Sequence, residues 1–334
     1  MKCQMSNVKY QALIISFIIV FIVFSFVSAQ FEIPSLSLEN FSLEISPDFP
    51  SPKEEVRASL TSYSFDLDRS NITWVHNGKT VLKGMGEKIY RFKAGTVGKE
   101  EVVKAIILTP SGNSLQEARS IIVADADLLW QAKTSFPFAY QAKPLPVLRS
   151  RVKVVAEPHF IFQGSRISPS NLVYKWFLGE EVQQESSGFG RQAFEFTVPV
   201  IASDSQKVKV EISSLKGSVN ARKAVFIPIR EPKVLIYEEH PLQGPKFNRS
   251  LTGLKAVSPS QIDFRAAPYY FSRTDSLVYD WSVNGKPAEK TKPFNLLNLK
   301  IGEGFFGKIS VNLRVENPAN VLETAENNFE INAE

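Results

Sequence analysis

The amino-acid sequence predicts an all-β protein built from three β-sandwich domains in tandem. Similar short segments carry a tryptophan at nearly equal spacing, at Trp74, Trp176 and Trp281. Apolar and polar residues alternate over many short stretches, and no segment after residue 30 sustains the 3.6-residue period of a helix. Turn-forming residues separate these stretches at regular intervals. A period of about 100 residues with one core tryptophan per period is typical of small sandwiches in a row.

Each repeat begins with a strand whose apolar residues alternate, so that one face points inward. These opening strands are Val56–Leu60, Val152–Ala156 and Ile262–Ala266. The tryptophan strand comes next, and its same-parity neighbours are Ile72 and His76, Tyr174 and Leu178, and Tyr279 and Val283. A tryptophan at the centre of such a strand is expected to lie across the interior and bury a large apolar area.

A tight hairpin is predicted directly after each tryptophan strand. The pairs Asn77-Gly78, Gly179-Glu180 and Asn284-Gly285 suit the positive-φ positions of such turns. Three further strands complete each repeat. They are Ile89–Phe92, Val102–Leu108 and Ala118–Val123 in the first, Phe194–Val198, Val208–Ile212 and Ala221–Ile227 in the second, and Phe294–Leu297, Ile309–Val315 and Ala325–Ile331 in the third.

These strands divide the chain into a linker, 30–40, and three domains, 41–124, 125–229 and 230–334. The expected connectors, Ala124–Asp127 and Pro228–Pro232, are short, and prolines bracket the second. Such connectors are stiff. With strands of eight to ten residues at about 3.3 Å per residue, three domains end to end reach on the order of 90 Å.

Residues 1–29 have the composition of a secretory signal. Two lysines precede an apolar run from Ala12 to Val27, and small residues, Ser28 and Ala29, follow it. The alternative is an uncleaved anchor helix over residues 12–29, because a run of roughly 18 apolar residues can also span a bilayer. Either way the rest of the chain is expected to be exported to the cell envelope or the extracellular space, with membrane contact only through this segment.

Composition excludes several kinds of chemistry. The single cysteine, Cys3, precedes the apolar run, so the exported part has no thiol nucleophile, disulfide or cysteine-bound zinc. The formal charge is +5, and without Lys2 and Lys9 it is +3. Acidic and basic residues are interspersed along the whole chain, which argues against a nucleic-acid partner.

The tryptophan followed by a hairpin, as in Trp74–Lys79 and Trp281–Lys286, resembles the immunoglobulin-like and PKD-like β-sandwich repeats of bacterial cell-surface proteins. The layout of the whole chain is similar to that of uncharacterised exported bacterial proteins. The resemblance implies immunoglobulin-like sandwiches and a surface location. It implies no catalytic residue.

Candidate catalytic and metal-binding residues are sparse. His76, His159 and His240 occupy different places in their repeats and have no metal-ligand spacing, so we expect surface or strand-end roles for them. The loop Asp66–Asn71 offers alternating oxygen ligands for calcium, although Arg69 opposes a cation and a solvated turn is the favoured interpretation. Asp125 and Asp127 form a second, similar pair. We expect no catalytic residue, no resident metal and no cofactor.

Aromatic residues are the strongest candidates for a binding surface. They gather in the loop that precedes each tryptophan strand, at one end of each sandwich, and a further group follows Trp130. The alternative role is packing, either within a sandwich or against the next domain. The candidate partner-binding residues are Tyr63, Phe65, Phe136, Phe138, Tyr140, Phe160, Phe162, Tyr269, Tyr270 and Phe271.

These observations favour a non-enzymatic, exported envelope protein that acts as a structural, adhesive or protein-interaction rod. Its partner would be another envelope protein or a surface glycan. A carbohydrate-binding accessory protein is the alternative, and it requires aromatic rings along an exposed face or groove. An enzyme has only scattered carboxylates such as Glu180, Glu181 and Asp204 in its favour.

Overall fold

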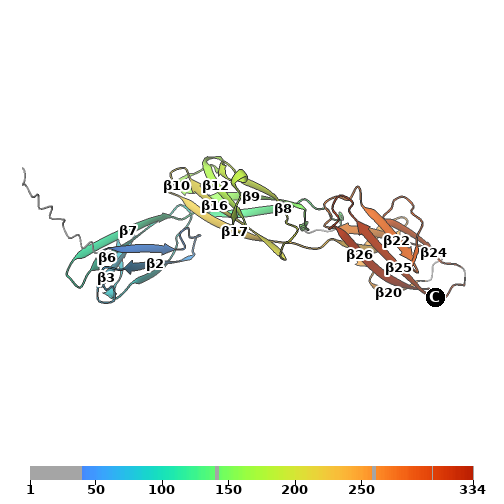
Figure 1. Ribbon diagram of the computed structural model, residues 1–334, viewed down its shortest axis with the longest axis horizontal. Coiled ribbons are helices and arrows are strands. Elements are labelled where there is room, and N and C mark those ends of the chain that lie inside the picture. The colour runs from blue at the N-terminus through green and yellow to red at the C-terminus, as the bar shows by residue number, and fades with distance from the viewer. Residues whose placement is uncertain (1–39, 140–142, 258–260, 303, 334) are drawn as a thin grey trace, which may run out of the picture.

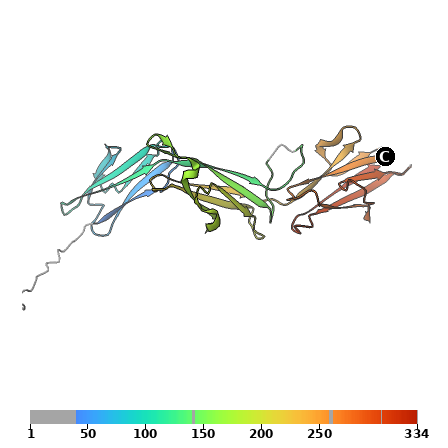
Figure 2. The same cartoon turned by 90° about the horizontal axis from the view of Figure 1, so that it is seen from above.

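The computed structural model describes residues 40–139, 143–257, 261–302 and 304–333. In this part of the chain the fold is all-β, with three immunoglobulin-like sandwiches arranged end to end in an elongated molecule (Figures 1 and 2). No helix of the described residues is long and apolar enough to span a membrane. The predicted signal or anchor segment, residues 1–29, lies outside the described residues.

The first domain has a three-stranded and a four-stranded sheet. The smaller sheet has the order β1-β2-β5 and the larger β4-β3-β6-β7. The strands are β1 (Phe41–Ser46), β2 (Glu55–Ser62), β3 (Asn71–His76), β4 (Lys79–Met85), β5 (Ile89–Lys93), β6 (Glu100–Leu108) and β7 (Ser114–Ile122).

The second domain repeats this topology, with a smaller sheet β15-β9-β8 and a larger sheet β13-β12-β16-β17. Its strands are β8 (Asp125–Ala132), β9 (Arg151–His159), β12 (Leu172–Leu178), β13 (Glu181–Val182), β15 (Ala193–Thr197), β16 (Ser205–Ser214) and β17 (Asn220–Pro228). A fifth short strand of the larger sheet, β14 (Gly188–Phe189), also pairs with β12. The loops contain β10 (Ile161–Phe162), β11 (Ser165–Arg166) and two 3₁₀ turns, η1 (Pro169–Asn171) and η2 (Gln184–Ser186).

The third domain keeps the core topology and adds one antiparallel strand, β19, and one parallel strand, β20. The sheets have the orders β19-β18-β21-β24 and β20-β26-β25-β22-β23, and β20 pairs with β26 in parallel. The strands are β18 (Lys233–His240), β19 (Gly244–Ser250), β20 (Gly253–Val257), β21 (Gln261–Tyr269), β22 (Val278–Val283), β23 (Lys286–Pro287), β24 (Leu296–Lys300), β25 (Gly307–Glu316) and β26 (Thr324–Ala333).

The three repeat tryptophans join the two sheets of their domains. Trp74 and Trp176 are fully buried and Trp281 is 8% exposed. Each indole Nε1 donates a hydrogen bond to a backbone carbonyl two residues before a strand of the opposite sheet. The acceptors are Glu87 (2.7 Å), Arg191 (2.8 Å) and Phe294 (3.2 Å), ahead of β5, β15 and β24. Each indole therefore contributes both core volume and a polar link between the sheets.

The hairpins after two of these strands have the predicted backbone. Asn77 and Gly78 have φ values of 49° and 80°, and Asn284 and Gly285 have 50° and 73°. The asparagine side chains add a contact to the next strand in the sheet: Oδ1 of Asn77 accepts from the backbone N–H of Val102, and Oδ1 of Asn284 accepts from that of Ser310, both at 2.9 Å.

The first interdomain junction is shorter than the sequence suggests. Because β8 begins at Asp125, only Val123 and Ala124 separate it from β7, and both are buried. Contacts hold the two domains on either side of this link. Lys223 Nζ and the Ser51 hydroxyl reach Asp125 Oδ1 at 3.0 and 3.4 Å. The Arg222 guanidinium of the second domain lies 5.1 Å from the ring centroid of Phe49 in the first.

A glycine at this junction permits a very close approach. Gly98 has a φ of 81°, and a Cβ there would lie 2.8 Å from the Cβ of Ile161 in β10. We expect Gly98→Ala to cost about 1 kcal/mol for backbone strain and a further 1–3 kcal/mol for the clash. Gly78 is the matched control, since it has a φ of 80° and nothing within 4 Å of its Cβ position. Calorimetric unfolding of both variants checks this: equal losses would mean that the junction yields without cost.

Candidate interaction site at the junction of the second and third domains

The smaller sheet of the third domain is apolar on both faces. In β18, Val234 and Ile236 point into the sandwich core, whereas Leu235 and Tyr237 belong to a separate apolar cluster on the outer face. In the neighbouring β21, Ala267 and Tyr269 belong to this outer cluster as well. In the first two domains, the central strands of the smaller sheets have charged residues at outward positions, such as Arg57 in β2 and Lys153 in β9. A sheet with two apolar faces needs a cover on each.

The cover comes from the second domain, from the loop between β8 and β9. We call residues 133–139 the outgoing arm and residues 143–148 the return arm. The outgoing arm pairs with the third domain through its backbone: Ser135 N–H donates to the Phe271 carbonyl (2.7 Å), and Tyr270 N–H donates to the Ser135 carbonyl (2.8 Å). Ser135 Oγ donates to the same Phe271 carbonyl at 2.7 Å. This is a two-way bridge between domains.

The return arm supplies the apolar part of the cover. Val147, which is 1% exposed, and Leu145 pack in the outer cluster with Tyr237, Tyr269 and Tyr270. Two hydrogen bonds fix this arm, because the Arg230 N–H donates to the Pro146 carbonyl and Thr134 Oγ1 donates to the Leu145 carbonyl, both at 2.9 Å.

A buried polar network secures the junction from the third domain. Glu323 is fully buried, and its Oε2 accepts from the backbone N–H and the hydroxyl of Ser272 and from Asn317 Nδ2, at 2.9, 3.0 and 2.6 Å. Its Oε1 accepts from Asn320 Nδ2 (2.9 Å), and the same amide donates to the Leu148 carbonyl of the second domain (3.1 Å). The carboxylate therefore orients a side chain that binds across the junction.

The contacts of the return arm predict that Val147→Asp separates the second and third domains. A carboxylate at this position would be buried without a partner, and the arm is expected to leave the sheet instead. We expect the free energy of unfolding of the third domain to fall by about 3 kcal/mol, and that of the first domain to be unchanged. Calorimetry of the full chain measures this, with exposed Val200→Asp as the matched control. A shift in all three domains would contradict a local role for Val147.

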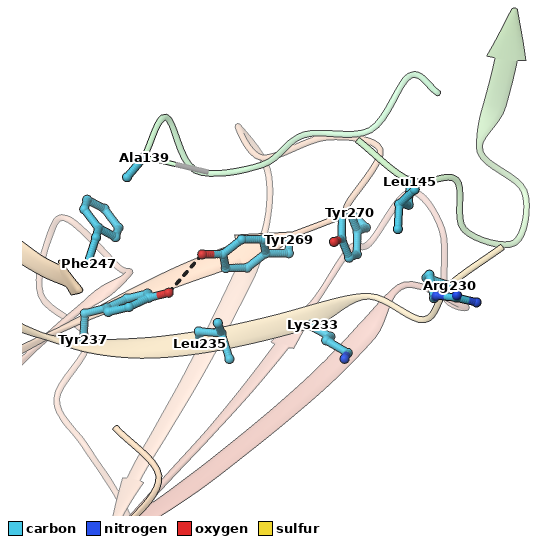
Figure 3. Close-up of a pocket in the computed structure, with 9 residues that line it drawn as sticks. All are labelled: Ala139, Leu145, Arg230, Lys233, Leu235, Tyr237, Phe247, Tyr269 and Tyr270. Atoms are coloured by element: carbon cyan, nitrogen blue, oxygen red, sulfur yellow. Dashed lines mark hydrogen bonds between the residues drawn. The ribbon is translucent and has the colours of Figure 1, made fainter. Parts of the chain in front are cut away.

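The arms leave a cavity against the outer face, with a volume of about 430 Å³. Figure 3 shows its walls: the hydroxyls of Tyr237 and Tyr269 meet at 2.9 Å near the centre, with Phe247 and Ala139 toward one end. Tyr270, Leu145, Lys233 and Arg230 lie toward the other end. The cavity is thus mostly aromatic and aliphatic, with hydroxyls and cations at defined places.

Ring contacts order the aromatic end of this cavity. Phe247 meets Tyr237 edge to face, with ring centroids 5.0 Å apart, and meets Phe138 of the outgoing arm in the same way at 5.3 Å. At the base of the arms, Lys143 Nζ lies 3.4 Å from the ring centroid of Trp130, and desolvation lowers the pKa of Lys143. A cation over an indole face is an attractive contact, and it links Trp130, which stands outside the repeat, to the return arm.

The predicted aromatic candidates divide between packing and exposure. Phe160 and Phe271 are fully buried in the cores of the second and third domains, so they cannot contact a partner. Phe65 packs partly against the core of the first domain, and Phe162 against that of the second. These residues have the packing role that the sequence left open. Tyr63 is fully exposed, away from the junction in the first domain, and a binding role for it remains a prediction.

The other candidates gather at the second junction. Tyr269 and Tyr270 line the cavity and are mostly covered by the arms, while Phe136 and Phe138 lie on the outgoing arm, with Phe138 87% exposed. Tyr140 lies outside the described residues. The structure therefore brings four of the predicted residues together at one place, although the sequence had assigned them to two separate groups.

The histidines and acidic loops have structural partners. His76 bridges Tyr90 Oη (3.0 Å) and the buried Glu101 carboxylate (2.9 Å), and His159 Nε2 lies 2.9 Å from Asp127. In the loop Asp66–Asn71, which the sequence predicts to be a solvated turn with calcium binding as the alternative, Asp66 Oδ1 accepts from the Asp68 N–H at 2.9 Å, as in an Asx turn. No group of three or more His, Cys, Asp or Glu that could hold a metal occurs in the described ranges.

Several residues at the junction escaped the sequence analysis. Tyr237, Phe247, Leu145 and Val147 were not predicted as site residues, and β18 was missed as a strand. The available signal was the uninterrupted apolar run Val234–Tyr237, which is what a strand buried on both faces requires.

The sequence matches no known family and no curated protein. Among solved structures, the fibronectin(III)-like modules of Clostridium thermocellum CbhA are similar over 57% of this chain and 94% of theirs, at 11% identity and a TM-score of 0.28. Three N-terminal domains of the bacteriophage RB49 highly immunogenic outer capsid protein are similar over 89% of this chain and 99% of theirs, at 13% identity and a TM-score of 0.25. SGBP-B of Bacteroides ovatus, solved with a mixed-linkage heptasaccharide, is similar over 88% of this chain and 70% of its own, at 10% identity and a TM-score of 0.22.

Proposed function

We propose that this chain is a non-enzymatic, exported rod that holds an interaction site at a fixed distance from its point of attachment. The observation that carries the proposal is the pair of built interdomain junctions. At the first, two buried residues connect the strands and Asp125 binds groups from both domains. At the second, the arms of one domain cover a sheet of the next.

Such junctions limit bending. Domains joined by flexible linkers move freely, whereas a large apolar contact between domains opposes relative motion. A stiff row of sandwiches suits a spacer or an adhesive protein, because it transmits position and force without needing a reactive site. The aromatic residues at the second junction supply a place where a partner could bind. Export follows from the composition of residues 1–29 and belongs to the same proposal.

Electron microscopy of single particles of the full chain tests the rod. We expect particles about 90 Å long or more, with a narrow distribution of angles between domains. Proximity labelling from the exported segment in the native cell envelope then tests the interaction role, and reproducible labelling of the same envelope component is the expected result. Particles bent at random angles, or labelling no different from that of an unrelated exported protein, would contradict the proposal.

A further inference from the structure

We propose that the cavity at the second junction binds an anionic sugar, with the sugar ring against the aromatic wall and its negative charge between Arg230 and Lys233. This inference rests on the proposed role of the chain as an interaction rod and names the ligand class of its site.

The wall of the cavity has the chemistry that a sugar ring requires. Pyranose rings present C–H groups on their faces and hydroxyls around their rims. Phe247 and the small exposed parts of Tyr237 and Tyr269, 4% and 8% of each residue, offer apolar ring surface for the former. The hydroxyls of the two tyrosines, which pair at 2.9 Å, lie in the same wall. A mainly apolar pocket with a few placed polar groups is the usual form of a small-molecule site, and about 430 Å³ lies in the size range of such sites.

The charge at one end selects among sugars. Arg230 and Lys233 line the cavity and are both exposed, so this end reaches solvent. Arg230 Nη1 donates to the Ile229 carbonyl at 3.1 Å, and neither cation is ion-paired with a carboxylate among the described residues. On the same face of β21, Arg265 is paired with Glu239 through two hydrogen bonds of 2.8 and 3.0 Å. The two cavity cations therefore remain available to an anion from outside.

The position of the cavity agrees with a binding role. Its walls come from both domains, since Leu145 and Ala139 belong to the arms and the tyrosines to the third domain. Backbone hydrogen bonds join Ser135 of the outgoing arm to Tyr270 and Phe271, and Pro146 of the return arm to Arg230, so these parts of the walls are formed before a ligand arrives. Preformed walls reduce the entropy that binding must offset.

Titration calorimetry on the full chain tests the inference with three matched probes: a glucuronate-terminated oligosaccharide, the glucose-terminated oligosaccharide of the same length, and its sulfated form. We expect at least one acidic probe to bind at least tenfold more tightly than the neutral one. The carboxylated and sulfated probes distinguish the two possible sources of the charge. Higher salt should weaken the acidic interaction, because the cations are exposed.

Charge-removing variants locate the site. Arg230→Gln and Lys233→Gln are each expected to weaken binding of the acidic probe about fivefold, in line with a partly exposed charge-assisted contact. Lys286→Gln, which changes an exposed lysine in a hairpin of the same domain, should leave binding unchanged. Thermal unfolding of each variant should match that of the unchanged chain, because neither cation is buried.

The possible outcomes separate this inference from the proposed function. Three outcomes contradict the anionic-sugar site, even if the particles are straight rods. They are equal affinity for the acidic and neutral probes, unchanged affinity in both the Arg230→Gln and the Lys233→Gln variants, and no binding of any probe. If the particles are straight, the reproducibly labelled partner is a protein and no sugar binds, the rod function is supported and the sugar ligand is contradicted. Binding of the acidic sugar by particles that are bent at random angles would contradict the proposed rod and support the binding site.

Discussion

Replacing Trp176 by alanine is expected to lower the free energy of unfolding of the second domain by about 4 kcal/mol. The side chain is fully buried, stacks on Phe194 with centroids 5.6 Å apart, and donates to the Arg191 carbonyl at 2.8 Å. Its removal leaves a large cavity between the sheets and a carbonyl without its donor, and both effects destabilise. Domain-resolved calorimetry or denaturant unfolding of the full chain measures the loss.

Two controls separate the contributions of this tryptophan. Trp176→Phe keeps most of the apolar volume and loses the hydrogen bond, so we expect a loss of about 1–2 kcal/mol. Trp130→Ala removes the tryptophan of the same domain that is only half-buried and contacts Lys143, and it should cost about 1 kcal/mol. Similar losses for Trp130→Ala and Trp176→Ala would show that the repeat tryptophan is not the centre of the core.

Glu101→Ala is expected to destabilise the first domain by about 3 kcal/mol. The Glu101 side chain is 1% exposed and accepts hydrogen bonds from His76 Nε2 (2.9 Å) and Asn77 Nδ2 (2.6 Å). Its other oxygen accepts from the Gly95 N–H and meets Lys99 Nζ, both at 3.1 Å. Loss of the carboxylate leaves these groups without their acceptor and removes a link between the hairpin and the loop after β5. The neighbouring, exposed Glu100→Ala should cost less than 1 kcal/mol, and equal losses would contradict the network.

The same carboxylate gives the first domain a dependence on pH. Burial raises the pKa of Glu101, but the hydrogen bonds from Asn77, Lys99 and His76 outweigh it and hold the pKa below the ordinary value of 4.5. Its contribution is therefore present above about 4.5 and is lost as the pH falls below that value. Glu101→Gln should flatten this part of the stability profile of the first domain, and an unchanged acid limb would show that other carboxylates govern it.

The sequence predicted the sandwiches because local and tertiary requirements agree along most of the chain. The tryptophan strands alternate correctly, and Asn77-Gly78 and Asn284-Gly285 have the turn conformation that their composition indicates. The strands that precede the predicted opening strands, β1, β8 and β18, were missed. Strand β8 follows β7 after only two residues. Its first residues, Asp125–Asp127, include two charged side chains and therefore resembled a connector in the sequence.

The candidate site was predicted in part. Aromatic content directed attention to Phe136, Phe138, Tyr269 and Tyr270, and the structure gathers these residues at one junction. Their meeting depends on a contact between residues more than 100 positions apart, such as Ser135 with Phe271. Periodicity within one repeat contains no information on such a contact, so the cavity and its cations could not be derived from the sequence.

The arms that cross the second junction make the last two repeats one inseparable unit. If the third sandwich were produced alone, Leu235, Tyr237, Ala267 and Tyr269 would face water, and the isolated piece would self-associate through that surface. Gene rearrangements that shuffle whole sandwiches would meet the same obstacle, since the third can be transplanted only together with the loop of its predecessor. The apparent modularity of the repeats therefore does not extend to the last two sandwiches.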